Sequence, residues 1–195
     1  MKKIMFNDKF LLTQAVLGGT KTMTRRIVDV PTECVFKTIA DSQGSIIHAV
    51  GYDEKPVFRW ETRYQIGEVV AVAQRYSDIG AASFDEWERE TNWFKKGFTN
   101  KMFVRADLMP HHIKITDVRV ERLQDITNED CLKEGVWQFC YDTDLFYVSK
   151  DIGYAGTVAF PSSREAFWYL INKICGKGTW ERNPWVEAYT FTRVD

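Results

Sequence analysis

The chain has 195 residues, of which 45% are hydrophobic and 27% charged, the proportions of an ordinary globular domain rather than of a disordered or fibrous protein. Its 26 basic and 27 acidic residues leave a net charge of −1, so any contact with nucleic acid must be local. No apolar run approaches the ~18 residues of a membrane-spanning helix, and the first residues lack a signal-peptide core. We therefore expect a single cytoplasmic domain without a membrane contact.

The N-terminal residues predict a short helix followed by a strand. Asn7 is a suitable N-cap, and Gly18 and Gly19 provide the left-handed stop that ends many helices. The polar and β-branched run at residues 21–30 predicts a strand, which the proline after it would close.

The middle of the chain predicts further strands with one helix between them. Residues 34–40 and 45–50 have the pattern of a hairpin, and the apolar run at 69–73 predicts a strand buried on both faces. A serine followed three residues later by glutamate predicts a short helix at 83–90. Residues 101–105 predict another strand.

The next segment predicts a long strand, a capped helix and an irregular region. Residues 113–122 read as a strand, after which Thr127 is expected to cap a short helix that Gly135 ends. Between residues 136 and 160 the aromatic and glycine-containing sequence has no clean period, which predicts an irregular excursion.

The C-terminal part predicts the clearest helix, at residues 163–175, with Ser162 as its cap, and then an alternating, half-buried strand at 185–194. Strands outnumber helices without alternating regularly with them, which favours an α+β fold with a mainly antiparallel β-barrel and short flanking helices. The prediction is one domain spanning residues 1–195, with insertions at about 31–64, 78–100 and 136–161.

Chemistry-bearing side chains concentrate in residues 19–26, directly after the glycine that ends the first helix. This segment holds three cations, Lys21, Arg25 and Arg26, and three threonine hydroxyls. A solvent-facing edge strand that its charges protect from aggregation would explain such a run without any function. A binding or catalytic cleft would explain it equally well.

The segment resembles the signature of the ASCH domains of the PUA-like superfamily, Gly-x-Lys-x-x-x-x-Arg, through Gly19, Lys21 and Arg26. The resemblance implies a PUA-like β-barrel and a ligand such as RNA or a modified nucleoside. It extends to the larger bacterial and prophage-type members of the family over residues 6–26, 67–70, 113–136 and 183–191.

Two functions follow from the resemblance. In the first, the protein binds RNA or a modified nucleoside through Gly19, Lys21, Arg25 and Arg26. In the second, it is an amidohydrolase, because some very small proteins that are similar to this family hydrolyse the acetyl amide of acetylcytidine with a lysine, a threonine and a glutamate. The matching catalytic residues here are Lys21, Thr24 and Glu134.

The strand pattern opposes the pairing of Lys21 with Thr24, because side chains three positions apart in a regular strand point to opposite faces. A shared site therefore requires an irregular turn, which Gly18 and Gly19 would permit. For Glu134, an exposed position in the last turn of a helix is the simpler expectation.

We expect neither a metal nor another cofactor. The four cysteines include no Cys-x-x-Cys pair, and His111 and His112 lack ligand spacing with any of them. Aromatic residues such as Trp137 could stack on a base, although core packing explains most of them. The sequence does not indicate an oligomeric state.

Overall fold

The fold is that of a computed structural model. The structure describes residues 1–28, 35–37, 46–50, 56–79, 96–139, 142–148 and 158–195. The predicted helix at 83–90 and most of the expected insertion at 78–100 lie outside these ranges.

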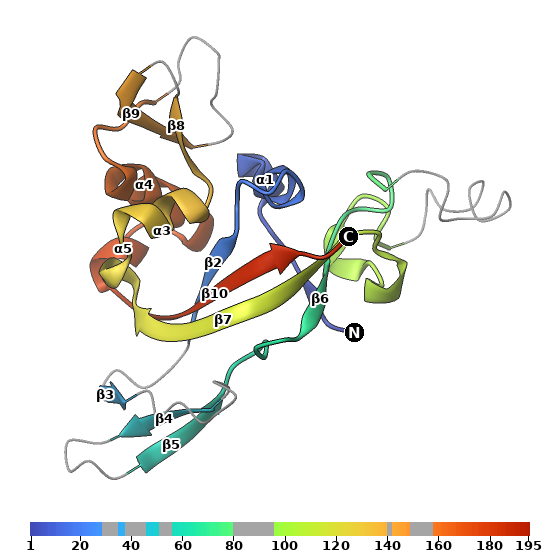
Figure 1. Cartoon of the computed structure of the whole chain (residues 1–195), viewed down its shortest axis with the longest axis horizontal. Coiled ribbons are helices and arrows are strands. Elements are labelled where there is room, and N and C mark those ends of the chain that lie inside the picture. Colours follow the sequence, from blue (N-terminus) through green and yellow to red (C-terminus); the bar gives the residue numbers. More distant parts are fainter. Residues whose placement is uncertain (29–34, 38–45, 51–55, 80–95, 140–141, 149–157) are drawn as a thin grey trace, which may run out of the picture.

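A five-stranded sheet forms the centre of the molecule, with the strand order β1-β6-β7-β10-β2. β1 and β6 pair in parallel and all other neighbours are antiparallel. Figure 1 shows β7 and β10 as long neighbouring ribbons that curve through the middle of the molecule. The strands are β1 (Lys3–Ile4), β2 (Met23–Ile27), β6 (Val69–Val72), β7 (His112–Arg122) and β10 (Trp185–Arg193).

The α+β class is confirmed, and four of the five strands predicted for one sheet lie in it. Hydrogen bonds among the described strands do not close this sheet into a barrel; β1 and β2 are its edges. The predicted half-burial of the last strand is wrong, because Val186, Ala188, Tyr189 and Phe191 are buried together with Glu187. β10 pairs with β7 and β2 along its two edges, and the consecutive buried positions 186–189 show that both of its faces are covered as well.

The described ranges contain four α-helices, three of which lie together to the left of β2 in Figure 1, whereas the fourth lies near the upper end of that strand. They are α1 (Leu12–Leu17), α3 (Asn128–Lys133), α4 (Ser163–Cys175) and α5 (Thr179–Arg182). α4 packs Ala166, Phe167, Leu170 and Ile171 into the main hydrophobic core, where they join the buried side chains of the strands. No helix within the described ranges is long and apolar enough to cross a membrane.

The N-caps predicted at Thr127 and Ser162 are confirmed. The Thr127 hydroxyl accepts a hydrogen bond from Asp130 N at 3.1 Å, and the Ser162 hydroxyl accepts one from Glu165 N at 3.2 Å. Asn7 caps a 3₁₀ turn, η1 (Asp8–Phe10), which leads into α1. These caps satisfy backbone donors that a helix start leaves without a partner inside the helix.

Two smaller sheets flank the central one. β3 (Val35–Lys37) and β4 (Ile46–Val50) form the predicted hairpin, to which β5 (Pro56–Glu61) is added. β8 (Val136–Phe139) and β9 (Asp142–Val148) form a second hairpin, drawn at the top of Figure 1.

The irregular excursion predicted from residue 136 onward is therefore wrong over β8 and β9. The register of this hairpin shifts between Gln138 and Phe139, and this irregularity hides the two-residue period of a strand. Phe160 then returns to pair with Phe146 as an isolated bridge.

The strand predicted at 101–105 is also wrong, because these residues begin a pair of 3₁₀ turns. The turns are η4 (Lys101–Phe103) and η5 (Ala106–Leu108). The Asn100 side chain accepts a hydrogen bond from Met102 N at 3.0 Å, which stabilises a turn in place of an extended chain.

Gly135 fixes the chain direction after α3 and provides a test of the fold. Its φ is +102°, and an added Cβ would lie 3.0 Å from Leu12 Cδ2 and 3.7 Å from Lys21 Cδ. We expect Gly135→Ala to lower the free energy of unfolding by about 1–3 kcal/mol, measured by urea denaturation.

Gly67→Ala is the matched control for this variant. Gly67 also has a positive φ, of +84°, but its Cβ would meet nothing within 4 Å. Its cost is therefore backbone strain alone, and Gly135→Ala should be the more destabilising of the two. Equal effects would show that Gly135 is not closely packed against Leu12.

Candidate functional site

A cavity of about 420 Å³ opens between β2 and α4. Its polar side carries Lys21, Thr24, Arg26 and Glu134, and α4 supplies an apolar wall that includes Phe167. The volume lies within the ~300–1,000 Å³ of pockets that bind small molecules.

Lys21 reaches this cavity because the chain between α1 and β2 is irregular. Gly19 has a φ of +75°, and the backbone N–H groups of Thr20 and Lys21 both donate to Ala15 O, at 2.9 and 3.0 Å. Thr22 N then donates to Lys133 O at 3.0 Å, so β2 begins only at Met23. The strand predicted from residue 21 thus starts two residues late, and strand alternation does not separate Lys21 from Thr24.

Lys21 and Glu134 form a buried ion pair. The Lys21 Nζ donates to Glu134 Oε2 and to the Glu134 backbone carbonyl, both at 2.7 Å. Their side chains are only 2% and 6% exposed. The prediction that Glu134 is an exposed residue at the end of α3 is therefore wrong, and the residue that ends this helix turns inward beside Lys21.

Burial lowers the pKa of Lys21, because the ammonium form loses its hydration inside the protein. The Glu134 carboxylate raises this pKa, and the nearby charges of Arg26 and Arg25 lower it again. The outcome is a pKa below the ordinary lysine value. The contact with Glu134 favours the charged pair, but burial has the larger effect and favours the neutral amine. Lys21 therefore loses its proton more easily than an exposed lysine does.

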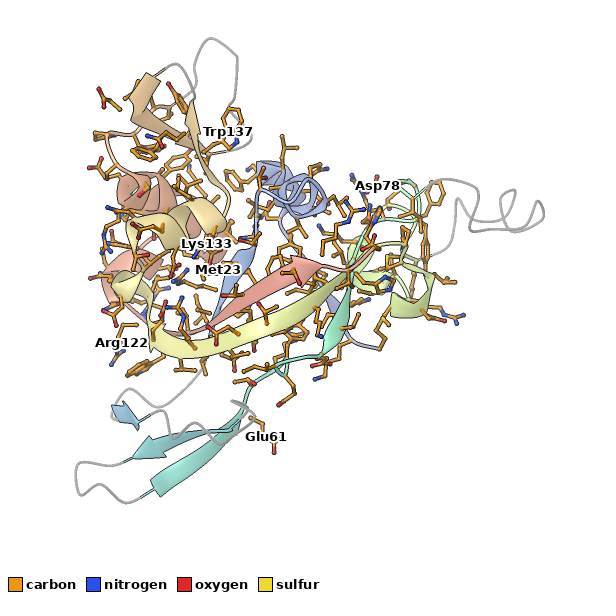
Figure 2. All side chains as sticks on the ribbon, in the orientation of Figure 1. Met23, Glu61, Asp78, Arg122, Lys133 and Trp137 are labelled. Atoms are coloured by element: carbon orange, nitrogen blue, oxygen red, sulfur yellow. The ribbon has the colours of Figure 1, made fainter. Side chains whose placement is uncertain are left out.

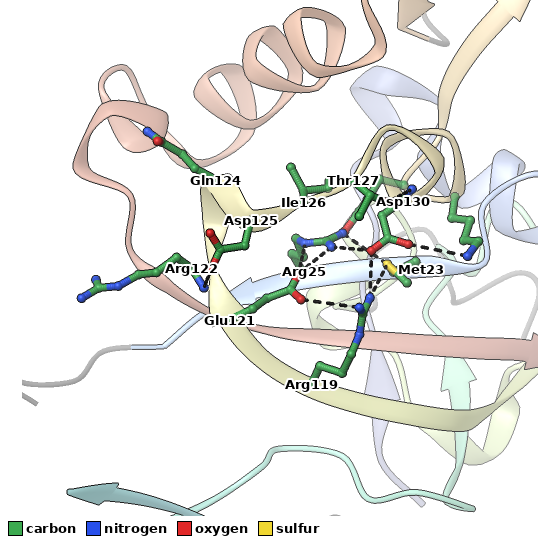
Figure 3. A network of polar contacts seen from close by, with 12 residues as sticks. Met23, Arg25, Arg119, Glu121, Arg122, Gln124, Asp125, Ile126, Thr127 and Asp130 are labelled. Carbon is green, nitrogen blue, oxygen red and sulfur yellow. Dashed lines mark hydrogen bonds and ion pairs between the residues drawn. The ribbon is translucent and has the colours of Figure 1, made fainter. Parts of the chain in front are cut away.

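Arg25 is held in a network of carboxylates that joins α3 to the sheet (Figure 3). Its Nη2 donates to Glu121 at 2.6 Å and to Asp130 at 3.0 Å, and its Nη1 donates to Glu134 at 3.2 Å. Arg119 Nη2 also donates to Asp130, at 2.8 Å. Burial raises the pKa of Asp130, but the hydrogen bonds from Arg119 and Arg25 outweigh it and hold this pKa below its usual range.

The Arg25 network limits what Arg25 can do for a ligand. The residue lines the cavity, yet three carboxylates bind its guanidinium and its side chain is 1% exposed. Arg25 therefore positions Glu134. Arg26, which was also predicted to bind the ligand, differs from Arg25 because its guanidinium contacts no carboxylate in the described part of the chain.

Thr24 and Arg26 lie on the same face of β2, two residues apart, and both line the cavity. Thr24 is buried, and its hydroxyl makes no hydrogen bond with any residue that the structure describes. Arg26 Nη2 donates to Met5 O at 2.5 Å, whereas its Nε is buried without a hydrogen-bond partner. Gly19 is exposed and does not line the cavity, so its role is confined to the turn.

Two charged residues that line the cavity were not predicted from the sequence. Glu187 is a buried carboxylate in β10, directly opposite Arg26, and the Tyr189 hydroxyl donates to its Oε2. Arg63 lies at the cavity after β5. Glu187 could have been found, because a glutamate inside an otherwise apolar strand is unusual. Nothing in the sequence next to Arg63 indicates that this arginine lines a cavity.

The residues considered for metal binding and base stacking, His111, His112 and Trp137, do not line the cavity. His111 Nδ1 is 2.5 Å from Asp195 Oδ2, and His112 N donates to Asp195 Oδ1 at 2.8 Å. Within the described ranges no three His, Cys, Asp or Glu side chains are grouped to hold a metal. Trp137 lies on β8, high in Figure 2, and does not line the cavity.

No protein-family model, curated protein or solved structure matches the chain. The comparisons therefore identify no family and no relative whose function could be compared. The proposed function therefore rests on the geometry of the cavity.

The buried Lys21–Glu134 pair predicts a large effect of Glu134→Gln on stability. The substitution keeps the shape of the side chain but leaves Lys21 and Arg25 without this counter-charge. Breaking a buried pair by removing one partner typically costs about 3–5 kcal/mol, and we expect a loss in that range on urea denaturation.

Asp78→Asn is the control for this variant. It breaks the ion pair of Asp78 with Arg75, 2.8 Å long, in which both side chains are more than a third exposed. Exposed pairs contribute about 0–1 kcal/mol, so the control should change stability little. An effect of Glu134→Gln as small as that of Asp78→Asn would mean that the buried pair does not hold α3 to β2.

Proposed function

We propose that the protein binds an N-acylated, cytidine-like nucleoside in this cavity and hydrolyses its amide bond. The observation that carries the proposal is that Lys21, Thr24 and Glu134 line one cavity, although the residues come from the turn before β2, from β2 and from the end of α3. These three residue types match the hydrolytic set implied by the ASCH resemblance. Membership of the ASCH family and a PUA-like barrel remain part of the proposal.

The two sides of the cavity suit the two parts of such a ligand. Phe167, Leu170 and Ile171 of α4 form an apolar wall against which a pyrimidine ring can pack. The polar side carries donors and acceptors for the amide and the sugar. In this arrangement the acyl group lies beside Thr24 and Lys21.

The chemistry requires a base for the Thr24 hydroxyl, because a neutral hydroxyl is a weak nucleophile. Lys21, once neutral, accepts the Thr24 proton as Oγ1 bonds to the acyl carbon. The C–N bond of the amide then breaks, and the Lys21 ammonium returns the proton to the leaving amine. Lys21 then accepts a proton from water as the water oxygen bonds to the acyl carbon, the ester bond to Oγ1 breaks, and the Lys21 ammonium returns the proton to Thr24 as the carboxylic acid leaves.

Glu134 serves this reaction by holding Lys21 in place. Its carboxylate and its backbone carbonyl each accept a hydrogen bond from Nζ, which fixes the amine of a long and otherwise mobile side chain. Arg25 orients the Glu134 carboxylate from the other side at 3.2 Å. Both interactions leave one further position on Nζ for the threonine hydroxyl.

Binding of RNA or a nucleoside without turnover is the second candidate. Arg26 favours it, because this residue lines the cavity and its guanidinium forms no ion pair with any residue in the described part of the chain. Lys21 and Arg25 argue against a phosphate-binding cluster of all three cations, since internal carboxylates already neutralise them.

The test is release of acetate from N4-acetylcytidine. We expect turnover by the unmodified protein and a loss of more than about a hundredfold in Thr24→Val, since that variant lacks the nucleophile. Thr24→Ser keeps a hydroxyl and should retain measurable activity. Thermal unfolding of each variant checks that the fold is intact.

Thr20→Val is the matched control, because Thr20 belongs to the same segment but is exposed and outside the cavity. It should release acetate at nearly the rate of the unmodified protein. Acetate release that survives in Thr24→Val would eliminate the threonine as nucleophile. If the unmodified protein binds the nucleoside without releasing acetate, the binding module is the correct function.

A further inference from the structure

Four cationic side chains but only two carboxylates line the cavity. Lys21 is paired with Glu134, and Arg25 with Glu121 and Asp130 in addition to Glu134. Arg26 and Arg63 also line this cavity, and neither forms an ion pair with a residue in the described part of the chain. Two cations therefore line the cavity without a counter-ion among the described residues.

Of these two arginines, Arg26 has the greater need of a counter-ion, because its guanidinium is largely buried. Its contacts are one hydrogen bond to Met5 O and the face of the Phe6 ring, 5.8 Å from the guanidinium carbon. The Nε is buried and has no hydrogen-bond partner among the described residues. A largely buried cation without a counter-ion is costly, and a ligand anion would supply that counter-ion.

Arg63 is the second cation without an ion pair among the described residues, and it also lines the cavity. It is exposed and follows β5, and its guanidinium carbon lies 5.7 Å from the centre of the Tyr64 ring. The charges of Arg26 and Arg63 repel each other, and this repulsion adds to burial in lowering the pKa of Arg26. An anion bound between the two would remove the repulsion.

The carboxylates of the cavity do not fill this role. Glu134 is already neutralised by Lys21 and Arg25. The charge of Glu134 still raises the pKa of Arg26, and Glu187 accepts a hydrogen bond from Tyr189, but neither carboxylate forms an ion pair with Arg26 or Arg63. The unpaired cations thus remain available to a group that arrives with the ligand.

We propose that Arg26 and Arg63 form a subsite for a terminal phosphate, so that the ligand is a nucleotide and not a free nucleoside. Planar guanidinium groups bind phosphate through paired, charge-assisted hydrogen bonds, which favours phosphate over a neutral sugar hydroxyl. The subsite extends the proposed function, on which it rests for the nucleoside part. A free nucleoside 5′-monophosphate and the 5′-phosphorylated end of an RNA share this chemistry.

Calorimetric titration with the reaction products tests the subsite without turnover. We expect cytidine 5′-monophosphate to bind the unmodified protein at least about tenfold more tightly than cytidine, since a hydrogen bond to a charged group is worth that much or more. Arg63→Gln should reduce the ratio of the two affinities to near one. Added salt should reduce it as well.

Two controls accompany the titration. Arg105→Gln removes an exposed cation that does not line the cavity and should leave the affinity ratio unchanged. Arg26→Lys keeps the charge but removes Nε, and a smaller ratio in this variant would assign the buried donor to the phosphate. Arg63 is exposed, so its variant keeps the test valid even if Arg26 variants unfold.

The outcomes separate this proposal from the proposed function. Equal affinities for the nucleotide and the nucleoside would overturn the phosphate subsite, whatever the result for acetate release. A phosphate effect that Arg63→Gln does not change would overturn the assignment to Arg63. Tighter binding of the monophosphate without acetate release would support the subsite and eliminate the hydrolase. Tight binding of a 5′-phosphorylated dinucleotide, but not of the monophosphate, would identify the source as an RNA end.

Discussion

The buried contact between Lys21 and Glu134 is the interaction on which the site depends. Removing two charges from water costs several kcal/mol for each ion, and their mutual attraction offsets that cost only with good geometry and additional hydrogen bonds. Here Nζ makes two bonds of 2.7 Å to one residue, and Arg25 binds the other carboxylate oxygen. The local fold supplies this geometry through the turn at Gly19 and the inward end of α3.

The same interaction explains why the polar side of the cavity is divided into two parts. Lys21 and Arg25 are occupied by carboxylates from β7 and α3, so they shape and orient the site. Thr24 and Arg26 also line the cavity, and the buried Nε of Arg26 has no hydrogen-bond partner among the described residues. Unsatisfied buried polar groups are rare in proteins, and here they occur where a ligand would bind.

Local patterns predicted much of the fold. The caps at Thr127 and Ser162 rest on short-range hydrogen bonds and were found correctly from the sequence. The error at 101–105 arose because the Asn100 side chain stabilises a turn where the residue types favour a strand. At 136–148 a shifted register concealed a hairpin.

The site was less accessible to sequence reasoning. Strand periodicity opposed the meeting of Lys21 and Thr24, and only the resemblance to a family connected Lys21 with Glu134, which is 113 positions away in the sequence. Arg63 could not be found at all, because its place depends on how the chain after β5 returns to the central sheet. A contact between segments that are far apart in the sequence produces no periodic pattern from which it could be predicted.

The most direct test of the central claim is the ionisation of Lys21 itself. Lysines labelled with ¹³C at Cε can be titrated by NMR, and the Lys21 signal can be assigned by its absence in Lys21→Met. Because burial disfavours the ammonium form, the midpoint should lie below the ~10.4 of an exposed lysine. A midpoint at or above that value would show that Glu134 keeps Lys21 protonated, and Lys21 could not then act as the base.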